Sequence, residues 1–143
     1  MKVVVNSCYG GFSLSQEAVM RYAEIKGITL YLEVDPKWLS MNLVTYWTCP
    51  PEERTGILRD EKFYEASMQE RQASNQAYSK RTLNDREIAR DDPVLVQVVE
   101  EMGRDANGRC AELRVVEIPD DVKWEIEEYD GKEWVAEVHR TWY

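Results

Sequence analysis

Hydrophobic positions along the chain follow two different periods, and these predict both strands and helices. Short β-branched apolar runs predict strands at residues 2–6, 28–34, 42–48 and 111–118, because such side chains favour extended backbone. These runs end at residues that form turns, such as Asn, Asp, Gly and Pro. After residue 121, two segments alternate between apolar and polar residues, so a C-terminal β-hairpin is expected.

A first helix is predicted after the loop of residues 6–13. Ser13 and Gln16 have the spacing of a capping box, in which each side chain bonds the backbone of the other residue. Gly27 provides the expected C-terminal stop. The loop therefore connects the first strand to this helix.

Two more helices are expected further along the chain. Asp92 followed by Pro93 is a typical helix start, and an apolar stripe extends from there to Met102, with a stop predicted at Asn107–Gly108. Residues 60–77 have a thin apolar stripe, so a helix there should keep most of its surface in water. Residues 82–90 are expected to be a connection.

The register of the hairpin depends on the length of its loop. A three-residue loop at 129–131 pairs apolar positions with one another and puts Gly131 in the left-handed position. A two-residue loop places Trp124 opposite Glu137, which mixes the two faces. The three-residue loop is therefore predicted. It pairs Ile126 with Trp134, Trp124 with Ala136, and Val122 with Val138.

These elements predict an α+β fold in one domain spanning residues 1–143. A mixed, mostly antiparallel sheet is expected from the N-terminal strand, the next two strands and the C-terminal hairpin, packed on the two main helices. The length suits one domain with a real core. A variable middle segment, at about residues 35–90, lies within it.

Charge narrows the set of partners. The net charge is -9, which repels nucleic-acid phosphates, so no direct nucleic-acid binding is expected. Residues 116–138 hold nine acidic residues and two lysines, so the acidity is concentrated in the hairpin region. Glu125 and Glu127 are expected on its outer face, where a solvated surface, a divalent-metal site or a surface mimicking nucleic acid are alternatives.

Cysteine usage and hydropathy indicate a cytoplasmic protein. Cys8, Cys49 and Cys110 are odd in number and lack CxxC spacing, so reduced thiols are expected rather than disulfides or a zinc ribbon. No apolar stretch has the length of a signal peptide or membrane span. No cofactor and no metal are expected.

The glycine loop (residues 6–13) is the main candidate ligand site. Gly10 and Gly11 precede a predicted helix N-terminus, where free N–H groups favour an anion. Tyr9 and Phe12 could stack on a base. The motif lacks the lysine of a P-loop, and a tight strand-to-helix turn is the competing interpretation. The candidate ligand-binding residues are Asn6, Cys8, Tyr9, Gly10, Gly11, Phe12, Ser13, His139 and Arg140.

The last two of these residues supply different chemistry. Arg140 could form a bidentate contact with a phosphate. His139 is the chain's single histidine, and pairing with Cys8 would give a nucleophilic dyad, but no third member of such a site is recognisable. A surface role for His139 is the competing interpretation. No catalytic residue is assigned, and an enzyme is not expected.

Three segments of the chain carry a likeness to other proteins: KVVVNSCYGGFSLS near the N-terminus, RDDPVLVQVVEEMG, and LRVVEIPDDVKWEIEEYDGKEWVAEVHRTW at the C-terminus. Through these segments, both ends of the chain resemble a group of small proteins encoded in bacteriophage genomes. The resemblance implies a phage accessory protein in the cytoplasm of an infected bacterium. Proteins of this kind often counter host defence.

The function expected from the sequence is capture of a small anionic or nucleotide-derived ligand, without catalysis, to counter a bacterial defence signal. The first alternative is an acidic inhibitor that binds a host defence protein, and a small nucleotide-processing enzyme is the second. The aromatic content, Trp124, Trp134 and Trp142 above all, makes a homo-oligomer plausible.

Overall fold

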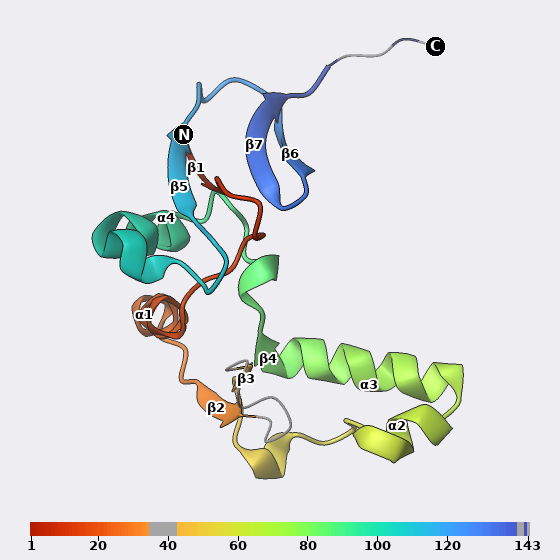
Figure 1. The fold of residues 1–143 in the computed structure, drawn as a ribbon. Helices are drawn as coiled ribbons and strands as arrows, with labels where there is room; N and C mark the ends of the chain where they lie inside the picture. The colour runs from red at the N-terminus through yellow and green to blue at the C-terminus, as the bar shows by residue number, and fades with distance from the viewer. Residues whose placement is uncertain (35–42, 140–141, 143) are drawn as a thin grey trace. The chain divides into compact units, whose positions relative to one another are not determined.

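The computed structural model describes residues 1–34, 43–139 and 142. The chain divides into two compact units. The terminal unit comprises Met1–Gly27 and Asp85–Tyr143, and the middle unit comprises Ile28–Asn84. Figure 1 shows the elements of each unit.

The terminal unit contains two strand pairs and two main helices. Strand β1 (Lys2–Asn6) pairs antiparallel with β5 (Leu113–Glu117). Helix α1 (Gln16–Lys26) packs against α4 (Pro93–Met102). Strands β6 (Trp124–Tyr129) and β7 (Lys132–Glu137) form the C-terminal hairpin, and β7 contacts β1. The core residues come from β1, the loop between β1 and α1, both helices and the segments just before and just after α4: Val3, Val4, Val5, Phe12, Leu14, Ala18, Val19, Tyr22, Ala23, Ile88, Leu95, Val96, Val98, Val99 and Ala106.

Helix α1 begins later than its predicted cap. Ser15, not Ser13, is the N-cap residue, and its hydroxyl accepts a hydrogen bond from the Ala18 N–H at 3.1 Å. The predicted capping box of Ser13 and Gln16 is therefore wrong, because Ser13 is used elsewhere: its carbonyl accepts from the Gly108 N–H. The predicted stop is confirmed, since Gly27 has the left-handed φ of 75°.

Helix α4 begins as predicted and ends earlier. The Asp92 side chain accepts from the Val94 and Leu95 N–H groups, and Pro93 occupies the first turn. The helix ends at Met102, because Gly103 turns the backbone, and a 3-10 turn from Gly103 to Ala106 follows. The predicted stop at Asn107–Gly108 is therefore too late by about one helical turn.

The predicted register of the hairpin is wrong. Tyr129 pairs with Lys132, Glu127 with Trp134 and Trp124 with Glu137, so the loop has two residues, Asp130 and Gly131. Both have positive φ, 50° and 90°, which is the geometry of a type I′ turn and matches the twist of the strands. The register set by the two-residue loop puts Glu133 on the inner face of the hairpin. It is possible because Arg90 pairs with the Glu133 carboxylate there.

The middle unit is built on a small antiparallel sheet. Strands β2 (Tyr31–Val34), β3 (Val44–Trp47) and β4 (Thr82–Leu83) pair in that order. Part of the segment predicted to form the third strand, residue 42, lies outside the described residues. Trp47 is buried, with Tyr78 at its edge and the guanidinium groups of Arg54 and Arg59 over its ring.

Two helices replace the single one predicted at residues 60–77. A short 3-10 turn (Pro51–Glu53) precedes α2 (Asp60–Glu65) and α3 (Met68–Arg81). The break falls at residues 66–67, where Ser67 caps α3 by accepting from the Glu70 N–H at 3.2 Å. Residues 82–90, predicted to be a connection, include β4 and a 3-10 turn (Asp85–Glu87).

The α+β class, the antiparallel pairing and the C-terminal hairpin are confirmed. Among the described residues, the strands form three small sheets and do not join into one. One physical reason lies at β1: the Val4 N–H, on the edge away from β5, donates to the Arg90 carbonyl at 2.8 Å. A non-strand segment therefore occupies an edge where another strand would pair. Among the described residues, no helix is both long and apolar enough to cross a membrane.

Candidate functional site

Asn6 organises the glycine loop. It ends β1, and its side chain is completely buried. The amide nitrogen donates to the carbonyls of Cys8 at 2.8 Å and Gly131 at 2.7 Å, and the amide oxygen accepts from the Glu112 N–H at 2.8 Å. One side chain thus links the loop, the segment before β5 and the hairpin turn.

The turn of the hairpin lies directly on the glycine loop. A Cβ atom at Gly131 would come within 2.6 Å of the Gly11 nitrogen and the Tyr9 carbonyl oxygen. On another side, a Cβ at Gly10 would come within 1.7 Å of the Cys110 carbonyl oxygen. Glycine at these positions therefore permits close backbone packing, and part of the loop that was expected to hold an anion is covered by the protein itself.

A charged pair fixes the hairpin to the rest of the unit. Arg90 forms a bidentate contact with Glu133, at 2.6 and 3.0 Å, and the two side chains are 16% and 11% exposed. Glu133 also accepts from the Asn6 N–H at 2.8 Å. The Arg90 guanidinium stacks on Phe12, 3.5 Å from the ring centroid. Two charges in low dielectric are tolerated here because both are hydrogen-bonded.

The structure gathers most of the predicted site residues and leaves others apart. The contacts just described involve Asn6, Cys8 and Phe12: the Asn6 amide donates to the Cys8 carbonyl, and the Arg90 guanidinium stacks on Phe12. The Tyr9 side chain, in contrast, is 62% exposed. His139 is exposed beyond β7, and Arg140 lies outside the described residues. Helix α1 begins at Gln16, five residues after Gly11, with a serine cap in place, so its N-terminus does not adjoin the two glycines.

The thiol of Cys8 has structural partners. It donates to the Cys110 carbonyl at 3.0 Å and approaches the Asn6 amide oxygen at 3.4 Å. Among the described residues, no hydrogen bond joins Cys8 to His139, the partner it would need in a nucleophilic dyad. No group of three potential metal ligands is found among the described residues either.

Sequence analysis missed Arg90 and Glu133 as a pair. Arg90 fell in a segment predicted to be a connection, and Glu133 was counted as part of the acidic surface. The signal that could have revealed them is the Asp130–Gly131 dipeptide, which favours a two-residue turn. That turn puts Glu133 on the inner face, where a carboxylate needs a cationic partner.

A second polar cluster joins α1 to α4. The Tyr22 hydroxyl donates to Asp92 at 2.8 Å, and Lys26 is 3.2 Å from the same carboxylate. Burial, followed by the hydrogen bond to Asp92, raises the pKa of Tyr22 to about 12. Burial alone would raise the pKa of Asp92, but the bonds from Tyr22, Lys26 and the helix N–H groups outweigh it and lower that pKa.

The outer face of the hairpin is exposed and combines carboxylates with aromatic side chains. It carries, from β6 and β7, the side chains of Glu125, Glu127, Tyr129, Lys132 and Trp134. Tyr129 is 70% exposed and Trp134 is 42% exposed. The Trp134 indole N–H donates to its cross-strand neighbour Glu127 at 3.0 Å. The expected outward position of Glu125 and Glu127 is confirmed.

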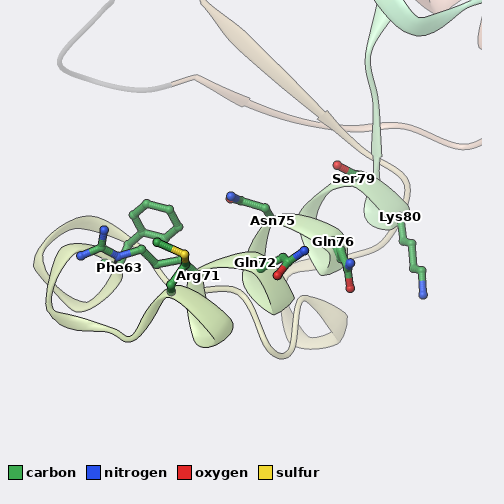
Figure 2. Close-up of a pocket in the computed structure, with 8 residues that line it drawn as sticks. Phe63, Arg71, Gln72, Asn75, Gln76, Ser79 and Lys80 are labelled. Atoms are coloured by element: carbon green, nitrogen blue, oxygen red, sulfur yellow. Dashed lines mark hydrogen bonds between the residues drawn. The ribbon is translucent and has the colours of Figure 1, made fainter.

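The middle unit has a hollow on α3. It has a volume of about 1060 Å³ and is lined by Phe63, Met68, Arg71, Gln72, Asn75, Gln76, Ser79 and Lys80. Figure 2 shows Asn75, Gln76 and Ser79 along the helix, with Phe63 and Arg71 at one end. The described residues that line this hollow include no carboxylate, which distinguishes it chemically from the hairpin face.

Comparison of the chain with protein-family models, with curated proteins and with solved structures gave no match.

Proposed function

We propose that this protein binds a basic surface of a partner protein through its outer hairpin face. The observation that carries the proposal is the cross-strand pair of Glu127 and Trp134, exposed on a hairpin that the protein holds in place. Tyrosine and tryptophan are enriched in protein interfaces, and carboxylates beside them favour a cationic partner.

The attachment of the hairpin supports this function. Its turn is held by the Asn6 amide, and its second strand is held by Arg90 through Glu133. A surface that is already ordered loses less conformational entropy when a partner binds. The outer face therefore needs no rearrangement to present its two carboxylates and two aromatic rings together.

The resemblance to phage-encoded proteins suggests the setting. In that setting the partner is a protein of the infected bacterium. A host protein that normally binds nucleic acid has the basic surface that the hairpin face requires. Ligand capture by the glycine loop stays a prediction. It receives less support from the geometry, because Gly131 packs on Gly11 and the α1 N-terminus is occupied by its own cap.

Co-purification from bacterial lysate tests the proposal with a matched pair of variants. The hairpin variant is Glu125→Lys/Glu127→Lys, and the control is Glu52→Lys/Glu53→Lys, which changes the net charge equally on the middle unit. The wild type and the control should retain the same basic protein at low salt, and the hairpin variant should lose it. Equal retention by all three proteins would contradict the proposal.

A further inference from the structure

Tyr9 extends the outer hairpin face, although it belongs to the glycine loop. The Lys132 Nζ atom lies over the Tyr9 ring, 5.7 Å from its centroid. Lys132 is the first residue of β7 and pairs across the hairpin with Tyr129, and both side chains belong to the outer face. The Tyr9 ring therefore adjoins this face at the end where the hairpin turns.

The backbone around Tyr9 is held while its ring stays exposed. A Cβ atom at Gly131 would come within 2.6 Å of the Tyr9 carbonyl oxygen, so the hairpin turn packs on the Tyr9 backbone. The carbonyl of the preceding residue, Cys8, accepts a hydrogen bond from the Asn6 amide. The Tyr9 side chain itself is exposed. An aromatic ring presented by a fixed backbone loses little conformational entropy when it binds a partner.

Three exposed rings from separate parts of the sequence thus lie on one surface. They are Tyr9 from the glycine loop, Tyr129 from β6 and Trp134 from β7. The face of an aromatic ring attracts cations, and Glu125 and Glu127 add negative charge beside the rings. Such a surface fits a guanidinium group, which stacks on aromatic faces and pairs with carboxylates through two N–H groups.

We propose that an arginine side chain of the basic partner stacks on the Tyr9 ring, in the place that the Lys132 ammonium group holds in the unbound protein. This inference rests on the function proposed above, and it names Tyr9 as a further binding residue and arginine as the group that Tyr9 recognises. The Lys132 contact is weak enough to be displaced, because it is exposed to water and close to the limit of about 6 Å for a cation–π interaction.

Lys132 should oppose arginine binding in the wild type. Among the described residues of the outer hairpin face it is the one cation, and it has the same charge as the arginine that would replace it. Lys132→Ala leaves the Tyr9 ring unoccupied and removes the repulsion between the two cations. The variant should therefore bind a basic partner more tightly than the wild type does, and most of that gain should require the Tyr9 ring.

Fluorescence anisotropy with a labelled octa-arginine peptide, titrated with the full chain at physiological salt, tests this proposal. Tyr9→Ala should weaken binding about threefold to tenfold, the range expected for a cation–π contact. Tyr9→Phe keeps an aromatic ring and should bind as the wild type does. The matched control Tyr64→Ala removes a similarly exposed tyrosine of the middle unit and should leave binding unchanged.

A double-mutant cycle shows whether Lys132 acts through the Tyr9 ring. Lys132→Ala should tighten octa-arginine binding about threefold when Tyr9 is present and clearly less in the Tyr9→Ala background. The control Lys62→Ala removes the same charge from the middle unit and should not tighten binding. Because the Tyr9 and Lys132 side chains are exposed, thermal unfolding of these variants should stay close to that of the wild type.

The outcomes separate this inference from the function on which it rests. If Glu125→Lys/Glu127→Lys abolishes octa-arginine binding and Tyr9→Ala leaves it unchanged, the outer hairpin face binds cations and the role of Tyr9 is overturned. If neither variant changes binding, both the function and the role of Tyr9 are overturned. Equal gains from Lys132→Ala with and without the Tyr9 ring also contradict the inference, because Lys132 then acts by its charge alone.

Discussion

Asn6 shows how a residue chosen as a ligand contact serves instead in this structure to hold the fold together. Its sequence neighbours, with two glycines close by, resemble a binding loop, and its polar side chain suggested contact with a ligand. In the structure, all of its described hydrogen bonds go to the protein itself. Sequence alone could not distinguish a ligand contact from a structural role, because the Gly131 carbonyl and the Glu112 N–H lie more than a hundred residues from Asn6 along the chain.

Replacing Asn6 should therefore cost much stability. Asn6→Ala leaves the Cys8 and Gly131 carbonyls and the Glu112 N–H without their partner, and we expect a loss of roughly 2–4 kcal/mol in the free energy of unfolding. Urea denaturation measures this loss. Ser7→Ala removes an exposed hydroxyl that donates to the Glu112 backbone carbonyl. It should cost less than about 1 kcal/mol in the free energy of unfolding. Similar losses for the two variants would contradict the role assigned to Asn6.

Two glutamates of the hairpin should lose very different amounts of stability on charge reversal. Glu133→Lys places an ammonium group beside the partly buried Arg90, and we expect destabilisation of about 3–5 kcal/mol. Glu127→Lys loses an exposed hydrogen bond from Trp134 and should cost about 1 kcal/mol or less. Thermal and urea unfolding of both variants check the difference. Equal stability would mean that Glu133 is not held by Arg90 in solution.

At the scale of the elements, strong local signals predicted the position of an element correctly, and weak local signals did not. Asp92 and Pro93 define the start of α4, because both the cap and the proline act within one turn. The hairpin was predicted in the right place with the wrong register. Its register depends on Arg90, a tertiary partner that makes an inward Glu133 favourable, and cross-strand pairing alone does not reveal such a partner.

The turn should not tolerate a side chain at Gly131. Gly131→Ala combines a φ of 90° with a Cβ that would be 2.6 Å from the Gly11 nitrogen and the Tyr9 carbonyl oxygen, so a loss of roughly 2–4 kcal/mol is expected. Gly56→Ala is the matched control, with a φ of 77° and open space around its Cβ. It should cost less, about 1 kcal/mol. Equal losses in denaturant unfolding would show that the turn does not pack on the loop.

The contact between α1 and α4 should make stability depend on pH at both extremes. The pKa of Asp92 is lowered, so its contribution is complete above the unfolded value of about 4 and is lost as the pH falls further. The pKa of Tyr22 is raised to about 12, so its contribution is complete below about pH 10 and is lost as the pH rises to 12.

Ultraviolet titration of tyrosinate and unfolding curves as a function of pH check these directions. Tyr22→Phe should remove the tyrosinate signal that appears near pH 12 and flatten the alkaline loss of stability, and Asp92→Asn should flatten the acid loss. If Tyr22→Phe leaves the alkaline titration unchanged, the Tyr22 hydroxyl is not buried against Asp92.

At the scale of the whole molecule, the pattern of hydrophobic positions predicted the class of fold better than the sequence predicted the site. The α+β class follows from the two hydrophobic periods, which are local properties of the sequence. The pairing of Arg90 with Glu133 and the packing of Gly131 on the glycine loop each join segments far apart in the chain. The hairpin region in which the acidic residues are concentrated has, with its register corrected, an ordered face with two exposed aromatic rings.

The most direct test of this function is calorimetric titration of the purified protein with the basic partner that it retains, at low and at physiological salt. The wild type should bind more weakly as the salt concentration rises, because the contact is electrostatic. Glu125→Lys/Glu127→Lys should bind at least about tenfold more weakly at low salt, and Glu52→Lys/Glu53→Lys should bind as the wild type does. An affinity that neither salt nor the hairpin variant changes would contradict binding through the outer hairpin face.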